Sequence, residues 1–242
     1  MNFNTITTKG ILKIQQKEKN MEKYIQILMK CDLFQKIPEH HILQLLNCLH
    51  GYRKTYQKDE VIYESGKKVN AIGIVLAGSV SITSLDYFGK RSIQAVFMQG
   101  DLFAETYACA FHSVMQVDVI AKEDCEILFV NPQQILQTCT NRCIHHYQMI
   151  QNLLQIIAQK NLILQEKLMI LSKRSAREKL LCFLDMMSKK KGSNQFTIPF
   201  NRNELADYLQ CDRSGLSVQL SKLKEEGMID YHKNEFILRT EI

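Results

Sequence analysis

The stretch from Tyr147 to Leu171 constrains the fold of this chain more than any other stretch. Its apolar residues recur in alternating steps of three and four, which is the heptad pattern of an α-helix that pairs with a copy of itself. The positions of this seam are Tyr147, Ile150, Leu154, Ile157, Asn161, Leu164 and Leu168. Because one asparagine within an apolar seam penalises other registers and oligomeric states, we expect a parallel homodimer.

A second apolar stripe runs beside this seam. It comprises Met149, Leu153, Ile156, Ile163 and Ile170. We expect this stripe to face the rest of its own subunit while the seam faces the partner. A helix from about Asn141 to Leu171 would be roughly 45 Å long, at about 1.5 Å per residue. The alternative is a helix buried in one larger core, but the chain on either side of the helix has the character of two separate modules.

Size and composition exclude several classes of protein. The chain has 242 residues and a formal net charge of +6, so it can hold two small domains and is compatible with nucleic acid. The sequence contains neither an apolar run of about 18 residues nor an apolar signal-peptide core, so we expect a cytoplasmic protein without membrane contact. Its eight cysteines form no CxxC pair and are expected to be free, mostly buried thiols.

The part of the chain before the long helix predicts a β-roll. Residues 1–20 are polar and Lys-rich, and we interpret them as a disordered or dispensable extension. From Tyr52 to Val130, short alternating runs are separated by glycines, which favours closely spaced antiparallel strands. Asp86–Lys90 has the composition of a hairpin tip, and Pro132 can start a short helix. With two short helices before the strands, this domain is expected to span 21–140.

The part after the long helix predicts a winged helix-turn-helix. Between the expected dimerisation helix, 141–172, and the C-terminus, the domain would span 173–242. Its expected elements are a helix over 175–188 followed by a turn, a strand over 196–200, helices over 201–209 and 213–226, and a hairpin around His232. Asn201 and Asp212 are suited to cap the second and third helices. Two helices joined by a tight turn and followed by a hairpin form this motif, so the predicted fold class is α+β.

One face of the helix over 213–226 is unusually small and polar. It carries Arg213, Ser214, Ser217, Val218 and Ser221. Short side chains permit close approach to a major groove, where an arginine can donate to guanine and a valine can contact a thymine methyl. We predict that this face reads bases, and that Arg202, Asn203 and the wing residue Lys233 hold the phosphate backbone.

Several short sequence motifs occur together in a characteristic order. They are Gly66, the segment Ile74–Val80, the segment Gly100–Glu105, Arg202–Ala206 and Asp212–Ser217. With them the chain resembles the Crp/Fnr family of bacterial transcription regulators, from about Met21 to Arg239. The segment from Phe103 to Ala110 is also similar to a subgroup common in anaerobic Firmicutes.

The resemblance implies a homodimeric regulator, not an enzyme. Its partners would be double-stranded DNA with a near-palindromic operator, an unknown small-molecule effector bound by the β-roll, and RNA polymerase if the regulator is an activator. An enzyme is further disfavoured because no nucleophile–base pair, phosphate loop or HExxH pattern is evident in the sequence.

The resemblance also implies an effector site in the roll. The matching positions are Gly100, Asp101, Phe103, Glu105, Thr106, Met115 and Gln116. In the family the matching Glu contacts the ligand, although Glu105 can equally brace its turn. Cyclic-AMP-binding members carry an Arg-Ser pair where this chain has Met115 and Gln116, so a charge-assisted phosphate clamp is missing. We therefore predict that cyclic AMP does not bind tightly, and leave the effector and any cofactor unknown.

The alternative is a redox, gas or metal sensor that acts through its thiols and histidines. Cys139, Cys143 and His146 have the spacing of one helical face and could ligate zinc or haem iron. We favour a packed helix start instead, because three ligands on one helix cannot complete a tetrahedral site unaided. Cys109 lies near the predicted pocket. In iron–sulfur sensors of the family three cysteines cluster near the N-terminus, and the isolated Cys31 and Cys48 do not match that design. We therefore assign no metal ligand.

Overall fold

The computed structural model describes residues 21–85, 91–110, 113–136 and 144–239. The chain divides into two compact units, Met1–Ala158 and Gln159–Ile242, and the boundary falls inside the long helix α6 (Ile144–Leu171). The predicted extension 1–20, the hairpin tip 86–90 and the expected helix start at Asn141 lie outside the described residues.

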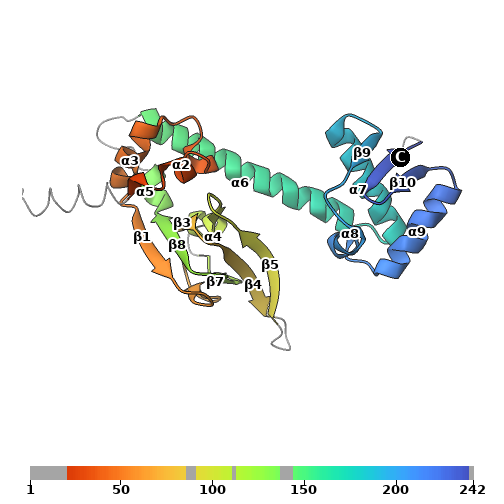
Figure 1. Cartoon of the computed structure of the whole chain (residues 1–242), viewed down its shortest axis with the longest axis horizontal. Helices are drawn as coiled ribbons and strands as arrows, with labels where there is room; N and C mark the ends of the chain where they lie inside the picture. The colour runs from red at the N-terminus through yellow and green to blue at the C-terminus, as the bar shows by residue number, and fades with distance from the viewer. Residues whose placement is uncertain (1–20, 86–90, 111–112, 137–143, 240–242) are drawn as a thin grey trace, which may run out of the picture. The chain divides into compact units, whose positions relative to one another are not determined.

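The first unit is built on two four-stranded sheets (Figure 1). The first sheet has the order β1-β8-β3-β6, with β1 (Tyr52–Tyr56), β8 (Cys125–Val130), β3 (Ile72–Ala77) and β6 (Leu102–Phe103). The second has the order β2-β7-β4-β5, with β2 (Val61–Tyr63), β7 (Asp118–Ala121), β4 (Val80–Leu85) and β5 (Arg91–Phe97). All these pairings are antiparallel, which confirms the predicted roll.

Strand β3 separates two apolar cores and is therefore buried on both faces. One core lies within the roll and contains Val75 and Phe103, and the other includes Ile72 and Ile74 and packs against helices. A Cβ added at Gly73 would lie 2.2 Å from the Phe103 ring, so only glycine fits opposite that ring. Close packing at this point fixes Phe103 inside the roll.

Short helices cover one end of the sheets in Figure 1. They are α2 (Ile25–Leu28), the 3-10 helix η1 (Asp32–Phe34), α3 (Glu39–Cys48) and α5 (Pro132–Leu136), whereas α4 (Glu105–Cys109) follows β6. The early part of α6 packs on them, and Asn152 Nδ2 donates hydrogen bonds to the carbonyls of Leu33 (3.0 Å) and Gln35 (2.8 Å). As the sequence predicts, Pro132 begins its helix; the end expected near Cys139 lies outside the described residues.

The second apolar stripe of α6 is buried, with one exception. Met149, Leu153, Ile156 and Ile170 are at most 6% exposed, as expected for residues that face their own subunit. The expectation is wrong for Ile163, which is 59% exposed. The apolar core of the first unit extends along α6 as far as Ile157, and that of the second begins at Ile170, so neither reaches Ile163.

The second unit contains three helices and a three-stranded sheet of order β10-β11-β9. Its elements are α7 (Ala176–Lys191), β9 (Gln195–Thr197), α8 (Arg202–Leu209), α9 (Arg213–Glu225), β10 (Ile229–His232) and β11 (Glu235–Leu238). This architecture confirms the predicted helix-turn-helix and wing. Helix α7 is longer than expected, because Lys189, Lys190 and Lys191 form its last turn, where cations are favoured, and Gly192 ends it at φ +62°.

Both predicted caps of the helix-turn-helix are present. Asn201 and Glu204 form a reciprocal capping box at the start of α8: the Asn201 side chain accepts from the Glu204 amide at 3.0 Å, and the Asn201 amide donates to the Glu204 carboxylate at 2.7 Å. Asp212 accepts from the Gly215 amide at 2.8 Å at the start of α9. These local bonds fix where the two helices begin. Among the described helices, none has the length and apolarity needed to cross a membrane.

Candidate nucleic-acid interface

Helix α9 presents one exposed polar face and one buried apolar face. Leu216, Leu220 and Leu223 are fully buried in the core of the second unit. The five residues predicted to read bases are all exposed, namely Arg213, Ser214, Ser217, Val218 and Ser221. The arrangement leaves a helix surface of mostly small side chains, flanked by one arginine, that can enter a groove.

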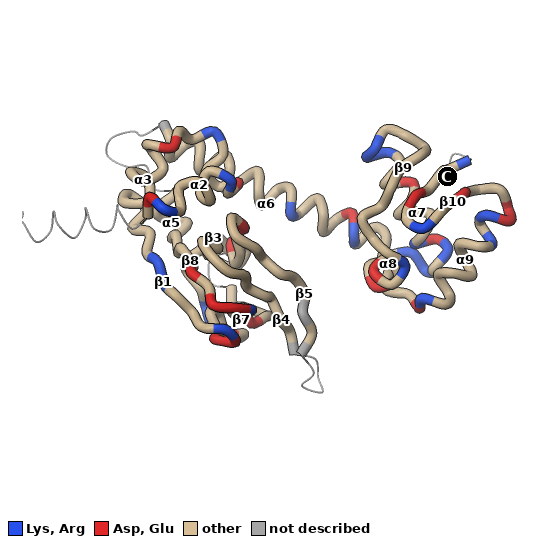
Figure 2. Tube along the Cα trace, in the orientation of Figure 1, with Lys and Arg blue, Asp and Glu red and all other residues tan. Residues whose placement is uncertain are grey.

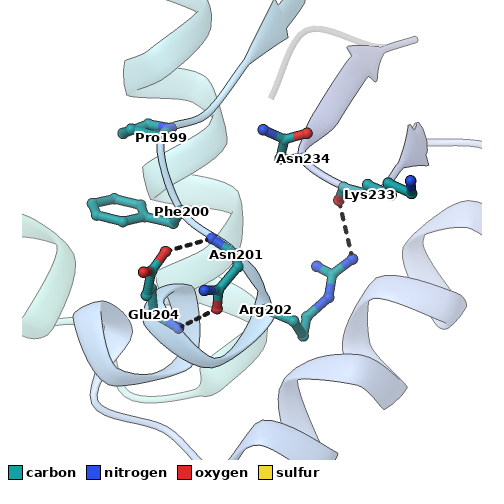
Figure 3. Close-up of a pocket in the computed structure, with 7 residues that line it drawn as sticks. All are labelled: Pro199, Phe200, Asn201, Arg202, Glu204, Lys233 and Asn234. Atoms are coloured by element: carbon teal, nitrogen blue, oxygen red, sulfur yellow. Dashed lines mark hydrogen bonds between the residues drawn. The ribbon is translucent and has the colours of Figure 1, made fainter.

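The start of α8 and the tip of the wing border one open hollow of about 520 Å³ (Figure 3). It is lined by Pro199, Phe200, Asn201, Arg202, Glu204, Lys233 and Asn234. In Figure 3 the guanidinium of Arg202 reaches across the hollow and donates to the Lys233 carbonyl at 3.4 Å. The structure therefore brings together two of the three residues predicted to hold phosphates, and the third, Asn203, is exposed in the first turn of α8.

The ring of Tyr231 contacts the guanidinium of Arg202, a contact that the sequence does not predict. The Arg202 guanidinium lies 5.2 Å from the centre of the Tyr231 ring, within range of a cation–π contact. Partial burial lowers the pKa of Arg202, and the nearby Tyr231 opposes this shift. The guanidinium stays charged near neutral pH, because the ordinary pKa of an arginine is above about 12. The sequence signal that could have indicated this contact is an aromatic residue two positions before the wing tip.

Charges of both signs lie near the end of α9, as Figure 2 shows. Asp230 pairs with Lys224 at 2.7 Å and with Arg239 at 3.2 Å. Hydrogen bonds from Lys224 and Arg239 lower the pKa of Asp230 to about 2. The Lys224 charge is therefore compensated within the protein, whereas Arg213 at the other end of α9 is exposed beside the predicted base-reading residues.

The seam predicted on α6 is exposed in the single chain. Tyr147, Leu154, Leu164 and Leu168 are 62–68% exposed, and Asn161 is also exposed. Ile150 and Ile157 are partly buried because they also pack against the core of the first unit. Large apolar side chains at heptad spacing in contact with water point to a surface that another helix covers.

The predicted effector residues divide into packed and exposed groups. Phe103 and Met115 are buried in the core of the roll, Glu105 is 4% exposed at the start of α4, and Thr106 and Gln116 are exposed. The Thr106 hydroxyl donates to Glu105 at 3.1 Å, which fits the bracing role considered for this carboxylate. An apolar, buried Met115 therefore occupies a position that the resemblance assigns to the phosphate clamp.

Gly100 and Asp101 shape the turn before this site. Gly100 has φ +93°, a conformation that glycine adopts without steric cost. The Asp101 carboxylate accepts from the Met98 amide at 2.8 Å, and the Asp101 carbonyl accepts from the Val75 amide at 3.0 Å. The Gly100 amide also donates to the Val75 carbonyl at 2.9 Å, so these two residues tie the turn between β5 and β6 to strand β3.

Of the six described cysteines only Cys31 and Cys125 are buried and Cys48 is exposed, so the expectation of mostly buried thiols is wrong for this part of the chain. Burial raises the pKa of Cys31 to about 12 and that of Cys125 to about 11, and burial together with Glu105 raises the pKa of Cys109. A raised pKa disfavours the reactive thiolate. Cys139 and Cys143 lie outside the described residues; within the described ranges, His, Cys, Asp and Glu form no group of three that could hold a metal ion.

Comparison with known proteins agrees with this geometry in both units. Residues 53–142 match the model of the cyclic nucleotide-binding domain, and residues 178–241 match that of the Crp-like helix-turn-helix domain. The chain is a Crp/Fnr-family regulator. The match to the Crp-like helix-turn-helix domain and the similarity to known regulatory proteins confirm that the chain is a transcription regulator and not an enzyme.

Relatives of this regulator are similar along most of its length. The regulatory protein HlyX of Actinobacillus pleuropneumoniae is 25% identical over 205 residues, which cover 80% of each chain. The transcriptional activator protein FnrL of Cereibacter sphaeroides is 23% identical over 205 residues, or 78% of this chain and 77% of FnrL. The crystal structure of Thermus thermophilus catabolite activator protein matches with a TM-score of 0.49 and 20% identity, over 87% of this chain and 94% of that one. HlyX and FnrL come from Proteobacteria, so the similarity to a Firmicutes subgroup stays a prediction.

Proposed function

We propose that this Crp/Fnr-family regulator acts in the cytoplasm as a homodimer that binds a near-palindromic operator, and that an effector in the roll controls its affinity. The observation that carries the proposal is the exposed face of α9, with Arg213 beside three serines and Val218. Only the apolar side of this helix is used for packing. The free side has the dimensions and chemistry of a major-groove reader.

The wing supports the same interpretation. Lys233 adopts φ +54°, a left-handed conformation that costs a residue with a Cβ roughly 1–2 kcal/mol. A glycine would avoid that cost, so a lysine here indicates a use for its ammonium group. Together with Arg202 across the hollow, it would place two cations where a phosphate backbone passes a winged helix.

The exposed seam supports the homodimer. Pairing the seams of two copies would cover Tyr147, Leu154 and Leu168 and would bury Asn161 opposite its counterpart. A two-fold axis along the paired helices relates the two winged motifs. We therefore expect operator half-sites about one DNA turn apart, roughly 34 Å from centre to centre.

The roll supports an effector other than cyclic AMP. The buried side chain of Met115 offers no charge to a cyclic phosphate, and Gln116 is uncharged. Losing the cationic partner of a partly buried anion costs several kcal/mol, on the order of a buried charged hydrogen bond or more. We propose that effector binding shifts the population of DNA-binding conformations, with RNA polymerase as a further partner if the regulator is an activator.

The test is Arg213→Ala against the wild type on an operator selected from random DNA and on an unrelated duplex. Loss of a bidentate base contact in both half-sites should weaken operator binding roughly 100-fold or more. Binding to the unrelated duplex should survive in part, because it depends on salt-sensitive phosphate contacts. Lys191→Ala, which removes an exposed cation from α7, is the matched control and should leave the ratio of the two affinities unchanged. Equal loss of both affinities in Arg213→Ala would count against base reading.

A further inference from the structure

Val218 occupies the centre of the exposed face of α9. The buried side is formed by Leu216, Leu220 and Leu223, and at about 100° per residue Val218 projects almost directly away from them. Its side chain is 51% exposed, although valine is among the residues that usually contribute to a core. Ser214 lies one helical turn before it and Ser221 one turn after it.

The neighbouring hydroxyl groups are already used as donors inside the protein. The Ser214 hydroxyl donates to Asp212, and the Ser217 hydroxyl donates to the Arg213 carbonyl at 3.0 Å. The hydroxyl groups of these two serines are therefore held close to the backbone of α9 and do not project from it. Within α9, all of whose residues the structure describes, Val218 is the one exposed large apolar side chain.

A single exposed apolar residue is common on protein surfaces and by itself needs no explanation. Two features distinguish Val218. A β-branched residue is disfavoured in a helix relative to alanine, lysine or glutamine, and at this position no packing within the unit compensates. In addition, the short side chains of Ser214, Ser217 and Ser221 leave Val218 unobstructed toward any surface that the helix approaches.

We infer that Val218 contacts the C5 methyl group of a thymine and thereby makes one thymine in each half-site a determinant of specificity. The inference rests on the proposed DNA-binding function. In the major groove, the thymine methyl is the apolar group by which an A·T pair differs from the other base pairs. A valine offers it two methyl groups and no donor or acceptor, so the contact excludes water from apolar surface on both sides.

Deoxyuridine, which differs from thymidine only in lacking this methyl group, gives a direct test. The full chain is first used to select an operator from random DNA. Each thymine is then replaced by deoxyuridine, one symmetry-related pair at a time. We expect wild-type affinity to fall at one such pair by about fourfold per half-site, or about fifteenfold for both, the loss corresponding to one buried methyl group.

Two variants assign that loss to Val218. Val218→Ala should bind the thymine operator about as weakly as the wild type binds the deoxyuridine operator, and it should not distinguish the two. Val218→Thr keeps the branched shape and one methyl group, so it should retain part of the preference. Circular dichroism should show both variants folded like the wild type, because the side chain is not part of a core.

The inference is overturned if the wild type is indifferent to deoxyuridine at every position, or if Val218→Ala keeps the wild-type preference for the methyl group. Failure of the proposed function would look different. The selection would then enrich no sequence, or Arg213→Ala would bind the selected operator as tightly as the wild type.

Discussion

The two units differ in how far their predicted site residues are exposed. On α9 every residue predicted to read bases is exposed, whereas in the roll Phe103, Glu105 and Met115 are buried among the side chains of several strands. A surface that enters a groove is formed by one face of one helix. A ligand pocket is assembled from distant segments, so each of its residues can also serve as core. The comparison teaches that exposure singles out the predicted DNA-binding face, but does not single out the predicted effector site.

The largest effect is expected from substitutions in α6, which contributes residues to both units. Leu154→Glu combined with Leu168→Glu would place like charges opposite each other in the paired seams. We expect the dimer to weaken roughly 100-fold or more, since an unpaired charge is costly in an apolar interface. Sedimentation velocity over a range of concentrations measures the change. Gln155→Glu, on the exposed side next to the seam, is the control that adds charge without entering it; equal dissociation by the control would refute the assigned seam.

A second test removes the side chain that fills the roll. Phe103→Ala should lower the free energy of unfolding of the first unit by about 3–5 kcal/mol, because the ring is fully buried against Gly73. Hydrogen exchange followed by mass spectrometry would locate the loss. We expect faster exchange in the strands of the first unit and unchanged exchange in α8 and α9. A change of less than 1 kcal/mol would show that the ring lines an open pocket instead.

The reciprocal test weakens the second unit alone. Asn201→Ala removes the cap of α8 and should cost about 1 kcal/mol of stability, because two amides at the helix start lose their acceptor. Exchange should speed up in α8 and leave the roll unaffected. Asn201→Asp, which retains the capping oxygen, should behave like the wild type. Loss of stability in the Asp variant as large as in the Ala variant would rule out the capping role.

The smallest expected effect concerns pH and the first unit only. His145 at the start of α6 lies 3.9 Å from His41, ring centre to ring centre, and His41 lies 4.0 Å from His40. Burial, with His41 and His40, lowers the pKa of His145. Below pH 6.5 the unfolded chain therefore binds a proton that the folded chain resists, so stability should decline as pH falls from about 6.5.

Replacing His145 isolates this effect. His145→Gln should lessen the decline in the unfolding midpoint between about pH 7.5 and pH 5, measured by thermal denaturation; part of it should remain, because burial also lowers the pKa of His146. His232→Gln, on the exposed wing of the second unit, is the control and should leave the pH profile of the wild type unchanged. A steeper decline in His145→Gln would mean that protonation of His145 stabilises the fold.

The sequence predicted best what depends on neighbours in the chain. Asn201 and Asp212 cap helices through residues three positions away, and the heptads of α6 identify its exposed side. The sequence predicted contacts between distant segments less well. Three features depend on which elements pack together: the exposure of Ile163, the contact of Arg202 with Tyr231 and the contacts among three histidine rings. No local periodicity reports these contacts.

The sequence by itself thus determined the helices, their caps, the antiparallel roll and the face of α9 that stays free of the core. Only the tertiary structure decided that Phe103 lies beneath Gly73 and that Arg202 reaches the carbonyl of Lys233, which is 31 residues further along the chain. The physical reason is range. Hydrogen bonds and side-chain periodicity within one element are set by residues a few positions apart, whereas packing between elements depends on the shape of both.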